Sequence, residues 1–209
     1  MEIFEFGDRS ARRILLQPVD GLELSLMDKE ITAIREGTEG DFRLMAFKVN
    51  NWNNDLSPWK APAVFGKEDF GGAAEDTLNE ILKHCEDSSA EYYIGGYSLA
   101  GLFALWASYQ SNLFKGVAAV SPSVWFPGFG DYMRDSEIKS GKVYLSLGNK
   151  EEKTRNPVTS TVGDRIREAQ LLLKQQGVDC VLEWNEGNHF RDTDIRTARG
   201  FARLLNRSV

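Results

Sequence analysis

Residues 91–101, with the sequence EYYIGGYSLAG, most constrain the fold because they predict a buried strand that turns sharply into a helix. The first half is rich in β-forming residues, and the sequence after Ser98 has the apolar spacing of an α-helix. Small residues on both sides of Ser98 let the strand and the helix approach closely. This pattern is typical of a nucleophile elbow, here GxSxA instead of GxSxG. The alternative is a serine that caps an ordinary helix.

A nucleophilic serine needs a general base, and the chain contains two histidines, His84 and His189. In hydrolases with this elbow, the acid and then the histidine follow the serine, each in a loop at the carboxyl end of a strand. His189 fits this order because it follows a predicted strand over residues 179–184 and lies in a loop with glycine and asparagine. His84 precedes the serine in a predicted helix over residues 75–86, where we expect a surface histidine.

The acid is expected after a further strand, predicted over residues 142–147. Two adjacent carboxylates, Glu151 and Glu152, follow this strand. Neighbouring residues that leave a strand point apart, so only one of them can face the histidine. Glu151 is preferred because its distance from Gly148 suits a tight turn that aims the side chain inward. The alternative is that both carboxylates are solvated and pair with nearby cations.

An acyl-transfer site also needs N–H donors for the oxyanion of its tetrahedral intermediate. The backbone N–H of Leu99, at the start of the predicted helix, is one candidate donor. The second is expected in the loop after a strand predicted over residues 41–49, where Asn51 and Trp52 are the best candidates. The alternative for this loop is an asparagine-rich structural turn.

Three tryptophans follow predicted strands and could line a substrate pocket: Trp52, Trp59 and Trp125. Trp52 and Trp59 follow the strand at residues 41–49, and Trp125 follows the first strand after the helix that Ser98 begins. The alternative for each is a place in the core, where large aromatic side chains are common. We expect these three side chains to form the walls of the pocket.

The segments GGYSLAG, SPSVWF, LSLGNKEE and EGNHF resemble the esterase D and enterochelin-esterase-like branch of the α/β-hydrolase superfamily. The resemblance covers roughly the last two thirds of the chain and is most specific at the elbow. It implies a serine hydrolase acting on a small ester or thioester, with Ser98, Glu151 and His189 as nucleophile, acid and general base. Two alternatives stay open: a hydrolase-fold protein that binds without turnover, and an acyltransferase that uses the same acyl-enzyme.

The chain as a whole predicts a mostly parallel sheet of about six strands with helices on both faces. The predicted strands cover residues 12–17, 41–49, 91–95, 116–120, 142–147 and 179–184. This is a trimmed α/β-hydrolase fold, forming a single domain over residues 1–209. We expect the strands at 41–49 and 91–95 to be neighbours, joined by a right-handed crossover through the helix at 75–86. The alternative is a flavodoxin-like sheet, which would leave the order of serine, acid and histidine unexplained.

The composition of the chain limits the classes of partner that we expect it to bind. A net charge of −6 and a pI of about 5.1 argue against nucleic acid or an anionic membrane as a partner. The charged start and the lack of a long apolar stretch predict neither a secretory signal nor a membrane span, which favours the cytoplasm. Cys85 and Cys180 are expected to stay reduced. With 2 histidines in the chain, we expect no metal and no cofactor.

Overall fold

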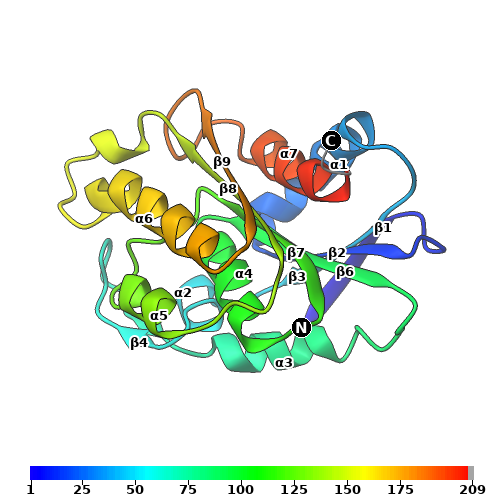
Figure 1. Ribbon diagram of the computed structural model, residues 1–209, viewed down its shortest axis with the longest axis horizontal. Coiled ribbons are helices and arrows are strands. Elements are labelled where there is room, and N and C mark those ends of the chain that lie inside the picture. The colour runs from blue at the N-terminus through cyan, green and yellow to red at the C-terminus, as the bar shows by residue number, and fades with distance from the viewer. Residues whose placement is uncertain (207–209) are drawn as a thin grey trace.

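The structure is a computed structural model that describes residues 1–206, and it contains a seven-stranded sheet flanked by helices (Figure 1). Positions 207–209 of the predicted domain lie outside the described residues. The strands lie in the order β1-β3-β2-β6-β7-β8-β9. Strand β1 is antiparallel to β3, and every other pair is parallel. The strands are β1 (Glu2–Gly7), β2 (Arg13–Val19), β3 (Arg43–Lys48), β6 (Glu91–Tyr97), β7 (Phe114–Val120), β8 (Lys142–Gly148) and β9 (Asp179–Asn185).

All six predicted strands are present, and the structure adds β1 at one edge of the sheet. The prediction that β3 and β6 are neighbours was wrong, because β2 lies between them and pairs in parallel with both. Six of the seven residues of β2 are buried, including Leu15 and Leu16 with no exposed surface. A strand buried on both faces is stable only inside a sheet, so β2 takes a central position.

Helices cover both faces of the sheet (Figure 1). Helices α1 and α7 pack against each other and bury their apolar residues on one face, whereas α3, α4, α5 and α6 contribute to the core on the other. The α-helices are α1 (Gly21–Gly37), α2 (Trp52–Asp55), α3 (Ala74–Leu82), α4 (Leu99–Gln110), α5 (Phe129–Asp135), α6 (Val162–Gln175) and α7 (Thr193–Leu205). Helix α4 is buried from Leu99 to Tyr109, which explains why its sequence is apolar on every side.

Helix α3 ends earlier than the predicted helix over residues 75–86. His84 and Cys85 therefore lie in the turn after it, where their backbone N–H groups donate to the carbonyls of Ile81 and Leu82. Such short-range bonds tighten the end of a helix. Cys85 and Cys180 are both free thiols.

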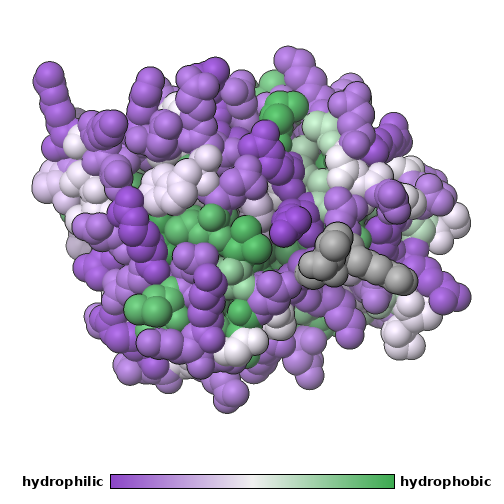
Figure 2. Space-filling view, turned by 45° about the horizontal axis from the view of Figure 1, so that its top comes forward, coloured by the Kyte–Doolittle hydropathy of each residue, from purple (hydrophilic) through white to green (hydrophobic). Residues whose placement is uncertain are grey.

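A two-stranded hairpin, β4 (Lys60–Ala61) with β5 (Phe70–Gly71), lies outside the main sheet. Two short 3₁₀ helices, η1 (Glu151–Lys153) and η2 (Thr159–Thr161), follow β8. In Figure 2, hydrophilic side chains cover most of the visible surface, and apolar ones show in smaller areas between them. Within residues 1–206, no helix combines the length and the apolar character needed to cross a membrane.

Candidate active site

The candidate site lies at the carboxyl edge of the parallel strands, where open α/β sheets place their binding crevices. Ser98 directly follows β6, and Ser121 directly follows β7. Glu151 lies three residues beyond β8, and His189 lies four residues beyond β9. The loops after β8 and β9 are joined by a hydrogen bond from the Lys150 N–H to the Gly187 carbonyl, at 3.0 Å. Parallel pairing of four neighbouring strands, β6 to β9, therefore brings together residues that are far apart in sequence.

The turn at Ser98 has the geometry of a nucleophile elbow. Ser98 has φ 57° and ψ −118°, a conformation that L-residues rarely adopt. A Cβ atom at Gly96 would lie 2.6 Å from the Cβ of Ala100, so glycine is required there for the strand and the helix to pass each other. The Ser98 side chain makes no capping hydrogen bond to α4. The alternative of a helix-capping serine is therefore wrong, and the hydroxyl is available at the pocket.

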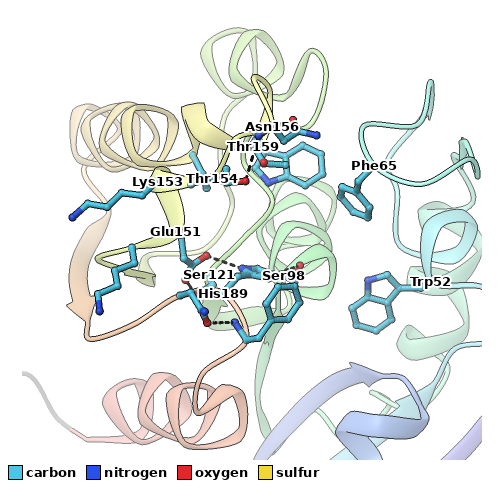
Figure 3. A pocket seen from close by; sticks show the side chains of 15 residues that line it. Trp52, Phe65, Ser98, Ser121, Glu151, Lys153, Thr154, Asn156, Thr159 and His189 are labelled. Atoms are coloured by element: carbon cyan, nitrogen blue, oxygen red, sulfur yellow. Dashed lines mark hydrogen bonds and ion pairs between the residues drawn. The ribbon is translucent and has the colours of Figure 1, made fainter.

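The structure brings Ser98, His189 and Glu151 into one hydrogen-bonded line (Figure 3). His189 Nε2 lies 2.9 Å from Ser98 Oγ, and His189 Nδ1 lies 2.7 Å from Glu151 Oε2. His84, in contrast, packs against Phe47. The imidazole can thus exchange a proton with the serine on one side while the carboxylate fixes its tautomer on the other.

The two candidate glutamates have different surroundings. Glu151 is buried and its Oε1 accepts hydrogen bonds from the Gly148 N–H at 2.7 Å and the Ser121 hydroxyl at 2.8 Å. The carboxylate of Glu152 instead lies near Arg167 on the surface. The structure therefore orients Glu151, and not its neighbour, toward the histidine.

The three candidate oxyanion donors have different surroundings in the structure. Leu99 is the first residue of α4, where a helix leaves N–H groups without intrahelical partners. Trp52 is the first residue of α2 and lines the pocket. Asn51 was predicted wrongly, because its N–H donates to the Asp55 carboxylate at 2.9 Å and its side chain caps α2. This is the asparagine-rich structural turn that was the alternative.

A pocket of about 560 Å³ opens beside Ser98 and His189. Trp52 and Trp125, two of the three tryptophans singled out from the sequence, line it together with Phe65 and Phe190. In Figure 3, Trp52 and Phe65 lie across the pocket from the serine and histidine. Both phenylalanines are more than half exposed, although neither is polar. Apolar rings exposed around a concave site are suited to contact with a ligand.

The prediction that Trp59 lines the pocket was wrong. Its indole N–H donates to the Pro127 carbonyl at 2.9 Å, and its ring packs against Phe126, Phe129 and Tyr132. Trp59 is partly buried, and the loop after β7 supplies the hydrogen-bond partner that its indole N–H needs there. Trp59 therefore anchors the start of the β4–β5 hairpin to the body of the protein.

Several residues near the site were not assigned to it from sequence. Ser121 has φ 43° and orients Glu151, and its position directly after a strand was a usable signal. Tyr97 donates a hydrogen bond to the His189 carbonyl and Arg196 donates one to Glu151, and the types and spacing of these two residues gave no signal. Arginine in a helix is usually exposed, so sequence alone favours a surface position for Arg196.

Comparisons with known proteins place this geometry in context. No protein-family model matches the chain, and no curated protein matches it either. Among solved structures, it is similar to the siderophore hydrolase EstA from Aspergillus nidulans, with 19% identity over 97% of this chain and 89% of that chain and a TM-score of 0.70. It is also similar to an alpha-beta serine hydrolase homologue from Coxiella burnetii, with 14% identity over 98% of this chain and 91% of that chain and a TM-score of 0.58.

A third similar structure is the enterobactin esterase FES from Shigella flexneri, with 14% identity and a TM-score of 0.63. The match covers 97% of this chain but 54% of FES. At these identities the likeness establishes the fold. The protein has the α/β-hydrolase fold, and the similarity to esterase-like α/β hydrolases that its motifs predicted is confirmed in its architecture.

Proposed function

We propose that the protein is a serine hydrolase that cleaves a carboxylic ester or thioester of a small molecule through an acyl-enzyme on Ser98. The observation that carries the proposal is the line from Ser98 Oγ through His189 to Glu151, with distances of 2.9 and 2.7 Å. The esterases among the similar structures support the same class of reaction.

The reaction starts when Ser98 Oγ attacks the carbonyl carbon and His189 Nε2 takes the hydroxyl proton. The resulting oxyanion accepts hydrogen bonds from the N–H of Leu99 and from the N–H of Trp52. When the carbon–oxygen or carbon–sulfur bond breaks, His189 returns its proton to the departing alcohol or thiol. Water, deprotonated by the same imidazole, then releases the acid and restores the serine.

The aromatic walls of the pocket favour a substrate with an aromatic or bulky apolar group next to the ester. Trp52, Phe65, Trp125 and Phe190 supply these walls. FES was crystallised in the presence of a benzoyl compound, 2,3-di-hydroxy-N-benzoyl-glycine. We therefore expect benzoyl or cinnamoyl esters to be hydrolysed with a higher kcat/KM than the corresponding acetyl esters.

A fluorophosphonate probe followed by peptide mapping tests the nucleophile without knowledge of the natural substrate. We expect labelling of Ser98 and of no other serine. Ser98→Ala should abolish labelling and lower p-nitrophenyl ester hydrolysis to background, because loss of the nucleophile in a comparable enzyme costs about 10⁶-fold in turnover. His189→Ala should be similarly inactive, and His84→Ala is the matched control that should keep normal activity.

The results of labelling and hydrolysis distinguish a hydrolase from a binding protein and from an acyltransferase. Labelling of another serine, or unchanged hydrolysis by Ser98→Ala, would contradict the proposed mechanism. Absence of both labelling and hydrolysis in the wild type would favour a binding protein with a hydrolase fold. Labelling with slow hydrolysis that accelerates when an added alcohol or amine accepts the acyl group would favour an acyltransferase.

A further inference from the structure

Arg196, in the first turn of α7, is a buried cation beside the proposed site. Its side chain is 3% exposed. Burying a guanidinium is costly unless it is paired and hydrogen-bonded. Arg196 meets this requirement with three partners: Glu151 Oε1 at 3.2 Å, the Tyr97 hydroxyl at 3.0 Å and the Glu186 carbonyl at 2.8 Å. It does not line the substrate pocket, so its effect on a reaction must pass through these partners.

These contacts connect the parts of the site that must stay in register. One guanidinium nitrogen, Nη1, donates to both Glu151 and the Tyr97 hydroxyl. That hydroxyl in turn donates to the backbone carbonyl of His189 at 2.8 Å. The other nitrogen, Nη2, holds Glu186, earlier in the histidine loop. Arg196 therefore links the acid, the strand that precedes Ser98 and the loop that carries the histidine.

Arg196 also affects the site through its positive charge, which lies beside the Glu151 carboxylate. The side chain of Glu151 is 3% exposed, so its carboxylate needs compensation within the protein. The titratable groups around it are Arg196 from α7, Tyr97 from β6 and His189 from the loop after β9. Burial, and then the charge of Glu151, raise the pKa of Tyr97 to about 12, so this phenol stays neutral in ordinary assays. Among residues 1–206, Arg196 thus supplies the permanent positive charge in contact with the carboxylate.

We propose that Arg196 is a positioning residue that compensates the charge of the buried Glu151 carboxylate and holds the His189 loop in register with Ser98. The inference rests on the proposed function, because it assumes that Glu151 and His189 serve the reaction. Removal of the guanidinium makes the Glu151–His189 pair bind a proton more readily, since a nearby positive charge opposes protonation of either member. The active form, with neutral imidazole and ionised carboxylate, then disappears at a higher pH.

The test compares four variants by their pH profiles on one p-nitrophenyl ester. We expect Arg196→Met to lower kcat roughly 10- to 100-fold, as loss of an outer partner of a site commonly does, with KM changed less than about twofold. The midpoint of its acid limb should move to higher pH. Arg196→Lys retains the charge but cannot bridge three partners, so kcat should fall with little movement of the midpoint. Tyr97→Phe should behave as Arg196→Lys does, because it breaks the link to His189 and leaves the charge.

Arg203→Met is the matched control, since Arg203 is an exposed arginine on the same helix. It should change neither kcat nor the midpoint. An unshifted acid limb in a folded Arg196→Met protein, or an equal shift in Arg203→Met, would overturn the charge effect. If Arg196→Met does not fold, as judged by its thermal transition, wild-type kcat in both Arg196→Lys and Tyr97→Phe would overturn the proposal.

Fluorophosphonate labelling of the wild type distinguishes a failure of the positioning role from a failure of the proposed function. Labelling at Ser98 with no effect of the Arg196 and Tyr97 variants refutes the positioning role alone. No labelling at Ser98 refutes the proposed function, whatever the variants do. Slower labelling of Ser98 in Arg196→Met than in wild type, at a pH below the wild-type midpoint, is the expected result.

Discussion

Glu151 and Glu152 differ in side-chain direction, and this difference predicts opposite effects of the same substitution. Glu151→Gln should lower kcat by about 10³- to 10⁴-fold, because an amide at this position can favour the wrong imidazole tautomer. Glu152→Gln should be nearly silent, since a partly exposed ion pair such as the one with Arg167 contributes about 0–1 kcal/mol. Both variants are measured in parallel on one ester substrate. A larger loss in Glu152→Gln would contradict the assignment, and no loss in either would indicate a serine and histidine pair that works without an acid.

For single residues, chain order and the positions of strand ends were enough to predict that Ser98 and His189 lie close together. The choice of Glu151 rested on its distance from Gly148 and on the alternation of side chains beyond a strand, and the structure orients it toward the histidine. Asn51 and Trp59 were placed wrongly because hydrogen bonds within the protein use their polar groups: Asn51 caps α2, and the Trp59 indole N–H donates to a carbonyl in the loop after β7. The Trp59 partner depends on tertiary folding, which sequence spacing does not describe. The Asn51 cap is local, and it is the structural turn that the sequence left open as an alternative.

The backbone at Ser98, in the turn between strand and helix, is strained. Residues that relieve this strain should therefore make the protein more stable, even though they remove the nucleophile. Ser98→Gly and Ser98→Ala both remove the nucleophile and should be equally inactive. Ser98→Gly should be more stable than Ser98→Ala by about 1–3 kcal/mol, because glycine adopts φ 57° without the clash of a Cβ atom. Urea unfolding of the two variants gives this difference directly.

Ser111 provides the control for the turn, since it follows α4 with φ −131°. At a negative φ, glycine has no conformational advantage and loses more entropy on folding than alanine. Ser111→Gly should therefore be no more stable than Ser111→Ala. The same order of stabilities at both positions would show that the effect at Ser98 does not come from its backbone conformation.

At the scale of elements, the alternation of strands and helices was predictable, but one edge strand was not. Strand β1 has the sequence EIFEFG and no fully buried residue, so it lacks the continuous apolar run that marks the central strands. Its place depends on pairing with β3, from Glu2 opposite Lys48 to Gly7 opposite Arg43. Such pairing joins segments distant in sequence, and a local pattern does not specify it.

At the scale of the whole molecule, sequence indicated the layers but not the order of the strands. The central place of β2 follows from its burial on both faces, and α1 and α7 cover one of those faces. This arrangement buries Gln17 of β2 against Glu30 of α1, with 1% and 2% of their surfaces exposed. The Gln17 amide donates to Glu30 at 3.3 Å, and Oε1 of each residue has no hydrogen-bond partner among residues 1–206.

This buried pair predicts how stability changes with pH. Burial raises the pKa of Glu30 well above its ordinary value of 4.5, so the folded state keeps a proton there that the unfolded chain releases. The stabilisation from this proton is fully present below about pH 4.5 and is lost as the pH rises toward the folded-state pKa. Glu30→Gln removes the ionisable group while preserving its shape. The free energy of unfolding of the variant minus that of wild type should therefore be larger at pH 8 than at pH 5.

Urea unfolding of both proteins at the two pH values measures the effect as a difference of differences, which cancels the titration of groups that do not interact with Glu30. Each pKa unit of elevation crossed in this range contributes about 1.4 kcal/mol. Glu36→Gln, an exposed change on the same helix, should show no such dependence. If Glu30→Gln and Glu36→Gln respond alike, Glu30 is ionised in the folded protein, and the sheet and α1 must then leave it access to water or a cation.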